Sequence, residues 1–160
     1  MARIPTPRGR FYEDFQLGDV YVHRPGRTVT EHDNIAFSLI TMNHHPTHVD
    51  AVYSAKTEFG RPLVNSCLTL AIVTGMSVDD VSYKAVSNLG WSEVKLLAPV
   101  FAGDTLFAES EVILKRESKK RPTAGVVTVR TTAAQQEGTV VMTFERTVLV
   151  PKRGHGIEAE

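Results

Sequence analysis

The chain has 160 residues, of which 18 are lysine or arginine and 18 are aspartate or glutamate. A chain of this length is expected to form one domain with its own core, and the balanced charge argues against a nucleic-acid partner or an anionic membrane surface. Cys67 is the single cysteine and cannot form an internal disulfide. The N-terminus lacks the apolar core of a signal peptide, and no apolar run approaches the ~20 residues that cross a bilayer. We therefore expect a cytoplasmic protein.

Both ends of the sequence are irregular. Residues 1–10 and 152–160 carry no hydrophobic periodicity, so we expect two flexible tails around a single domain at residues 11–151. After a turn near Gly18, residues 20–22 and 27–30 read as two short extended pieces rich in β-branched side chains. No internal repeat or low-complexity tract divides the chain further.

The first predicted helix covers residues 31–41. Thr30 and Asp33 have the spacing of a capping box, in which each side chain bonds the other residue's backbone N–H. Helical spacing then predicts an apolar face beyond this cap. That face comprises Ile35, Ala36, Leu39 and Ile40.

A second helical region follows a loop at residues 43–47, which Pro46 interrupts. Asp50 is expected to cap a short helix after this loop. From Asn65 or Ser66 the sequence becomes almost wholly apolar as far as Val73. A helix tolerates this composition only if most of its circumference is buried, so we predict the central helix of the domain here.

Beyond Val81 the hydrophobic period changes to two. Residues 105–114, 125–131 and 139–150 alternate in this way, with a turn at residues 135–138. One face of the first segment is expected to carry Leu106, Ala108, Ser110, Val112 and Leu114. Helices first and long strands afterwards predict an α+β fold, in which an antiparallel sheet wraps around the central helix. Because such a sheet ends in exposed edges, we expect edge pairing in a homodimer or higher homo-oligomer.

Three segments resemble the MaoC-like hydratases of the hot dog fold, which act on enoyl thioesters of coenzyme A or acyl carrier protein. Residues 43–50 (NHHPTHVD) are similar to the family pattern D-x-N-P-x-H-x-D, and residues 59–66 (FGRPLVNS) to F-G-x-P-I-x-H-G. Residues 99–106 (PVFAGDTL) are similar to P-V-x-x-G-D-T-L. The resemblance implies a hot dog fold with a short helical insertion that carries the catalytic loop.

Two departures from the family pattern point to one branch. Asn43 stands where most members have a catalytic aspartate, and Asn65-Ser66 where they have His-Gly. With the preceding Thr41-Met42, these residues resemble the mesaconyl-CoA and itaconyl-CoA hydratase-like proteins. That branch is similar to enzymes that hydrate or dehydrate branched C5 dicarboxylyl-CoA compounds. An amide is no base at neutral pH, so the usual His/Asp pair is reduced to His48.

The resemblance assigns catalysis to His48 and Asn43. His48 is the expected base, because imidazole titrates near neutrality; the alternative is that it only bonds a backbone carbonyl and fixes the loop. The Asn43 amide could hold the attacking water, or could only form a turn with its own backbone. A second substrate carboxylate nearby would explain why an amide replaces the aspartate. Asp50 is expected to cap a helix rather than to orient His48.

The substrate-binding assignments follow from the same resemblance. Backbone amides near Ser66 and Cys67, with Asn65, could stabilise negative charge on the thioester oxygen, because they lie at a helix N-terminus. Arg61 could pair with a second carboxylate of the substrate. His45 is the remaining predicted contact.

Metal and nucleophilic chemistry fit the residues less well. The histidines at positions 44, 45 and 48 lack the second ligand cluster of a zinc site, so we expect no metal and no cofactor. Neither Ser66 nor Cys67 lies in a Gly-x-Ser-x-Gly turn, and Cys67 is expected on a buried helix wall.

We therefore predict a carbon–oxygen lyase that adds water to a short branched enoyl-CoA, such as mesaconyl-CoA or itaconyl-CoA. One alternative is an (R)-specific hydratase of straight-chain enoyl-CoA or acyl carrier protein thioesters. The other is a non-catalytic hot dog subunit that only binds thioesters. Substrate isomer, reaction direction and subunit number stay open.

Overall fold

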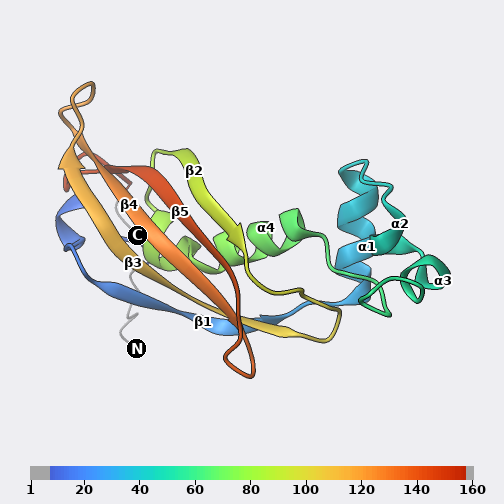
Figure 1. Ribbon diagram of the computed structural model, residues 1–160. Coiled ribbons are helices and arrows are strands. Elements are labelled where there is room, and N and C mark those ends of the chain that lie inside the picture. Colours follow the sequence, from blue (N-terminus) through green and yellow to red (C-terminus); the bar gives the residue numbers. More distant parts are fainter. Residues whose placement is uncertain (1–7, 158–160) are drawn as a thin grey trace, which may run out of the picture.

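The computed structural model describes residues 8–157, in which a five-stranded antiparallel sheet curves along one helix (Figure 1). The strand order is β1-β3-β4-β5-β2, with every neighbouring pair antiparallel. The strands are β1 (Val20–Thr28), β2 (Ser87–Leu96), β3 (Thr105–Glu117), β4 (Ala124–Gln135) and β5 (Val140–Pro151). The predicted α+β arrangement is confirmed.

The helices divide into two groups. One group, beyond one end of the sheet, comprises α1 (Glu31–Ile40), α2 (Pro46–Val49) and α3 (Ala51–Ser54) (Figure 1). The other is α4 (Ser66–Met76), which lies along the sheet and continues into a π-helical turn, η2 (Val78–Ser82). A short 3-10 turn, η1 (Tyr12–Asp14), precedes β1. The first group is the helical insertion that the resemblance implies.

The alternation in β3 is confirmed up to a bulge. Leu106, Ala108, Ser110 and Val112 are buried on one face, as predicted. Leu114, predicted on the same face, is 40% exposed instead. The pairing of β3 with β4 shifts register between Val112 and Leu114, and such a shift moves later side chains to the other face.

Helix α4 packs on the sheet through Leu68 and Val73. The prediction that most of its circumference is buried is wrong for the single chain, because Ser66, Cys67, Ala71 and Gly75 are exposed along one side. Cys67 therefore does not lie on a buried wall. The chain leaves one face of its central helix uncovered.

The C-terminal end of α4 is held by a buried arginine on β5. Arg146 is 1% exposed, and its Nη2 donates to the Ser77 and Ser82 hydroxyls at 2.9 and 3.3 Å. Burial lowers the pKa of Arg146 to about 10. A cation at this position also interacts favourably with the carbonyl groups that end a helix, so Arg146 fixes one end of α4.

A buried network fixes β1 against η2. The His23 ring is fully buried, with Nδ1 2.8 Å from Asp80 Oδ2 and Nε2 2.8 Å from Ser110 Oγ. Ser110 Oγ lies 2.8 Å from Thr131 Oγ1, which extends the network across the sheet. Arg10 donates to Asp80 from outside. No local sequence pattern indicates this cluster, because its members are far apart along the chain.

Parts of the two predicted tails contact the domain. Gly9 N–H donates to the Asp79 carbonyl at 2.9 Å, and Lys152 N–H donates to the Thr123 carbonyl at 2.9 Å. Arg153 pairs with Asp14. Residues 9–10 and 152–153 are therefore bonded to the domain rather than extending from it, whereas residues 1–7 and 158–160 lie outside the described part of the chain.

The predicted capping box of α1 is confirmed, and the apolar face of this helix is largely exposed. Thr30 Oγ1 accepts from the Asp33 N–H at 3.1 Å, and Asp33 Oδ2 accepts from the Thr30 N–H at 2.8 Å. Leu39 and Ile40, on the predicted apolar face, are 53% and 83% exposed. The buried residues of α1 are polar, namely Asn34 and Ser38. This side faces inward because backbone groups of neighbouring loops need its polar atoms as partners.

Asp33 makes the stability of α1 pH-dependent. Hydrogen bonds from the Thr30 hydroxyl and N–H, with the nearby Arg27 guanidinium, hold the pKa of Asp33 below its ordinary value. The charged carboxylate therefore stabilises the fold above the unfolded-state pKa, and this effect is lost as pH falls through the lower folded-state pKa. We expect Asp33→Ala to reduce the free energy of unfolding by about 1 kcal/mol near neutral pH. Urea unfolding of both proteins, from neutral pH to about pH 3, should show the difference shrinking below about pH 4; a constant difference would contradict the assignment.

Candidate active site

The loop before α2 is built on an asparagine turn. Asn43 Oδ1 accepts from the His45 N–H at 3.1 Å, and the Asn43 N–H donates to the Ser38 carbonyl at 2.8 Å. Asn43 thus has the turn role that the sequence left open, although its Nδ2 can still donate to a ligand. His45 is exposed and caps α2, with its Nδ1 accepting from the Thr47 N–H at 3.2 Å. The His45 ring centroid lies 6.1 Å from that of His48.

His48 is held by the segment that precedes α4. Its Nδ1 lies 2.8 Å from the carbonyl oxygen of Leu63. A carbonyl only accepts, so Nδ1 carries the proton, and in the neutral ring Nε2 keeps a free lone pair. The bond to a backbone carbonyl fixes the loop, which is the alternative role considered for His48. It also leaves Nε2 available to act as a base. Asp50 does not take part, because its Oδ1 caps α3 by accepting from the Tyr53 N–H at 2.9 Å.

The loop and the α4 segment are joined by their backbones as well. The Leu63 N–H donates to the Thr47 carbonyl at 2.9 Å. From α1, Asn34 Nδ2 donates to the carbonyls of His48 and Leu63 at 3.0 and 3.2 Å. Two segments 15 residues apart in sequence therefore form one rigid unit around the imidazole.

Of the two amides predicted to bind an anionic oxygen, those of Ser66 and Cys67, only one is free. Asn65 is the N-cap, and its Oδ1 accepts from the Cys67 N–H at 3.0 Å, so that amide is already used. Among the described residues, the Ser66 N–H donates no hydrogen bond. Asn65 itself is 3% exposed and donates to Ser38 Oγ at 3.3 Å. The geometry therefore favours the Ser66 N–H for an anionic oxygen, with Asn65 in a structural role.

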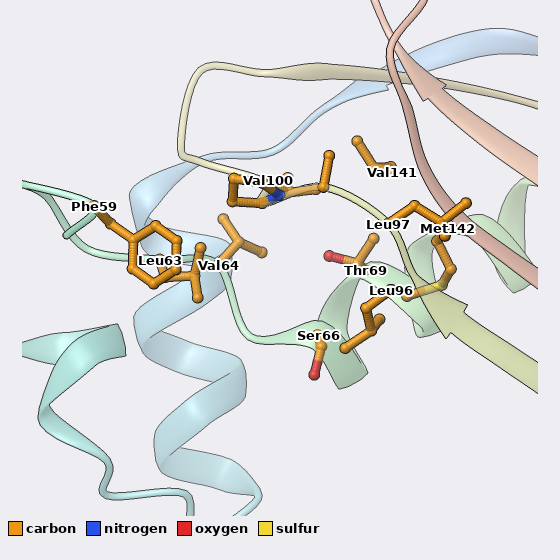
Figure 2. A pocket seen from close by; sticks show the side chains of 12 residues that line it. Phe59, Leu63, Val64, Ser66, Thr69, Leu96, Leu97, Val100, Val141 and Met142 are labelled. Carbon is orange, nitrogen blue, oxygen red and sulfur yellow. The ribbon is translucent and has the colours of Figure 1, made fainter. Parts of the chain in front are cut away.

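A largely apolar cavity of about 300 Å³ lies beside this amide (Figure 2). Ser66 and Thr69 supply the polar side chains of its wall, and the other lining residues come from the segment 59–64, the end of β2, the loop after it and β5. The cavity suits a short acyl chain whose carbonyl group points toward the helix start. His48 does not line it directly, but bonds the carbonyl of Leu63, which does.

Arg61 lies near the aromatic end of the cavity. Its guanidinium stacks over the Phe101 ring, with Cζ 3.9 Å from the centroid. Phe101 in turn packs edge-to-face with Phe59, a lining residue. Among residues 8–157, no carboxylate lies within ion-pair distance of Arg61, so its charge is available to an anion.

The structure thus brings together the imidazole, the helix start and the cavity. The residue that the sequence analysis missed is Asn34, which links all three. One sequence feature could have indicated it: Asn34 and Ser38 are four residues apart, so these two polar side chains share one face of α1.

Among the described residues, no three histidine, cysteine, aspartate or glutamate side chains are grouped to hold a metal ion. In the same range, no helix is both long and apolar enough to cross a membrane.

Comparison with known proteins identifies the family. The sequence profile described as mesaconyl-CoA hydratase matches residues 2–160. The chain belongs to the mesaconyl-CoA hydratase family. The predicted MaoC-like membership and its branch are therefore confirmed.

Two similar curated proteins are about twice as long as this chain. The mesaconyl-CoA hydratase of Cereibacter sphaeroides is 37% identical over 156 residues, which cover 94% of this chain and 43% of that protein. The β-methylmalyl-CoA dehydratase of Chloroflexus aurantiacus is 35% identical over 148 residues, covering 92% and 42%. The chain thus spans less than half of each relative.

Solved structures confirm the hot dog fold. A MaoC domain protein dehydratase from Chloroflexus aurantiacus superposes with a TM-score of 0.89 at 33% identity, covering 99% of this chain and 45% of that one. A Mycobacterium tuberculosis protein described as a double hot dog fold superposes with a TM-score of 0.84 at 22% identity, covering 94% and 47%. In both cases, this chain matches about half of the solved chain.

Proposed function

We propose that this protein is a hydratase/dehydratase, a carbon–oxygen lyase that adds water to the double bond of an enoyl-CoA thioester. The observation that carries the proposal is the His48 Nδ1 bond to the Leu63 carbonyl, which leaves Nε2 as a base. The Ser66 N–H lies at the start of α4, beside an apolar cavity that fits a short acyl group. The named activities of the two curated relatives support the same class of reaction.

The residues suggest a simple proton path. Nε2 of His48 removes a proton from water, and the oxygen of that water bonds to the β-carbon of the enoyl group. Negative charge moves to the thioester oxygen, where the Ser66 N–H donates to it. The proton held on Nε2 then passes to the α-carbon, which completes the addition of water and restores the imidazole.

The activity is tested by incubating the wild-type protein with mesaconyl-CoA and crotonyl-CoA. We expect the ultraviolet absorbance of the conjugated mesaconyl thioester to decline, with no release of free CoA thiol. Loss of crotonyl-CoA alone would favour the straight-chain alternative. Tight CoA binding without any loss would make the chain a non-catalytic subunit, and thiol release would make it a thioesterase.

We propose a C5 dicarboxylyl-CoA as the substrate, with Arg61 pairing with its second carboxylate. The guanidinium is free of other anions in the described structure and is held flat over Phe101, so little ordering is required when it binds. Arg61→Gln should raise the KM for mesaconyl-CoA about tenfold, and leave that for crotonyl-CoA within about twofold, because only the former carries the extra carboxylate. Steady-state kinetics on both thioesters provides the measurement. An equal rise for both would instead assign Arg61 to the CoA portion.

The reaction requires no metal or redox cofactor, so treatment with a chelator should leave the rate unchanged. An exposed edge of the sheet pairs with a second copy of the chain. The cytoplasmic location remains a prediction from the sequence.

A further inference from the structure

Asn34 joins three parts of the site through one side chain. It is 3% exposed, and its Nδ2 donates to the carbonyls of His48 and Leu63 at 3.0 and 3.2 Å. Its Oδ1 accepts from the Asn65 N–H at 2.8 Å. The loop that carries the imidazole, the wall of the cavity and the cap of α4 therefore meet at this amide.

The chemistry of this position requires an amide. A primary amide offers two N–H donors and one carbonyl acceptor, which match two partly buried backbone carbonyls and one buried N–H. Aspartate keeps an acceptor for Asn65 but has no donor for His48 and Leu63. Alanine leaves all three backbone groups without their partner, and such buried groups are rarely left unpaired.

The Leu63 carbonyl connects Asn34 to the base. It accepts from both Asn34 Nδ2 and His48 Nδ1, so the carbonyl that orients the imidazole is itself held from α1. Through Asn65, the same amide fixes the residue before Ser66, whose N–H faces the substrate in our proposal. A shift of Asn34 would move base and oxyanion donor relative to each other.

We propose that Asn34 is a positioning residue that holds the His48 imidazole and the Ser66 N–H in register for catalysis. This inference rests on the proposed hydratase function. Asn34 touches no reacting atom in this scheme. It acts through the orientation of the ring and through the placement of the helix start.

Kinetics provide the first test. Asn34→Ala and Asn34→Asp should each lower kcat roughly 10²-fold and leave KM within about threefold, because the acyl cavity is intact and alignment is lost. Ser110→Ala is the matched control: it also removes a buried, hydrogen-bonded side chain, but from the His23 network. Its kcat should stay within about twofold of the wild type. Equal losses in the control and in the Asn34 variants would overturn the proposal.

The tautomer of His48 provides a second test that needs no activity. In ¹⁵N-labelled wild-type protein, long-range ¹H–¹⁵N spectra should show the neutral His48 ring protonated on Nδ1, and Ser110→Ala should match it. The Asn34 variants should show a mixture of Nδ1–H and Nε2–H forms. An unchanged single tautomer in both Asn34 variants would refute positioning. If the wild type hydrates no thioester, the proposed function fails, yet these spectra still decide whether Asn34 orients the ring.

Discussion

His48→Gln should lower kcat for hydration by 10²–10⁴-fold, the range typical for removing a positioned acid–base group. Glutamine can still donate to the Leu63 carbonyl, which accepts from His48 Nδ1 at 2.8 Å, so the loop keeps its anchor. Its amide nitrogen, however, has no lone pair that takes a proton near neutral pH. The variant thus separates the base from the anchor, whereas His48→Ala removes both. Initial rates with mesaconyl-CoA at saturating concentration measure the effect.

A neighbouring histidine serves as the control for this prediction. His44 lies in the same loop and is exposed. His44→Gln should leave kcat within about twofold of the wild type. A His48→Gln enzyme with wild-type kcat would show that the imidazole only fixes the loop, and the base would then have to be sought elsewhere. A loss confined to KM would assign His48 to substrate binding.

The fold was predictable where local chemistry decides it. The capping box of Thr30 and Asp33 and the N-cap at Asn65 need only neighbours in sequence, and both predicted helix starts are confirmed. Strand alternation in β3 held until the bulge at Val112 and Leu114, because a bulge depends on the partner strand rather than on the sequence around it.

The buried face of α1 shows why apolar periodicity can mislead. Ile35 and Leu39 form an apolar stripe, yet Asn34 and Ser38 face inward. The loops packed against α1 present backbone groups that need polar partners, and leaving these unpaired costs more than exposing a few apolar side chains. Such groups belong to distant segments, so no local pattern announces them.

The candidate site was predictable only in outline, because part of it depends on contacts between distant segments. Motif spacing predicted that His48 lies close to the start of α4, and the Leu63 carbonyl joins the two. The motif could not show that the Asn65 cap uses the Cys67 N–H and leaves the Ser66 N–H free. Nor could it show Asn34, which precedes the motif and acts through backbone carbonyls.

The two edges of the sheet differ in how well they are protected. Edge strand β1 carries Arg24, Pro25 and Arg27 and a register shift, and Pro25 has no N–H to offer a further strand. Charges, prolines and bulges are the features by which proteins block edge pairing. Strand β2 also has register shifts but exposes Leu89, Trp91, Val94 and Leu96. Since the open side of α4 is also uncovered, we infer that β2 is the edge that pairs.

The surface that a single unit leaves open supports this inference. A single unit leaves β2 and one side of α4 exposed, and a second unit would cover both surfaces. We propose that a second copy of the chain supplies that unit with twofold symmetry, in which each β2 pairs with the other.

Leu89→Lys combined with Val94→Lys should convert the protein from a dimer to a monomer. The two side chains are 54% and 44% exposed, and burying two lysines at a symmetric interface places like charges together without partners. The matched control is Val20→Lys with Val22→Lys on β1, where the side chains are 51% and 54% exposed. Sedimentation equilibrium should give twice 17.7 kDa for the wild type and the β1 control, and 17.7 kDa for the β2 variant. Dissociation of the β1 variant alone would reverse the assignment of the edges. A monomeric wild type would mean that a different hot dog chain, rather than a second copy, covers β2.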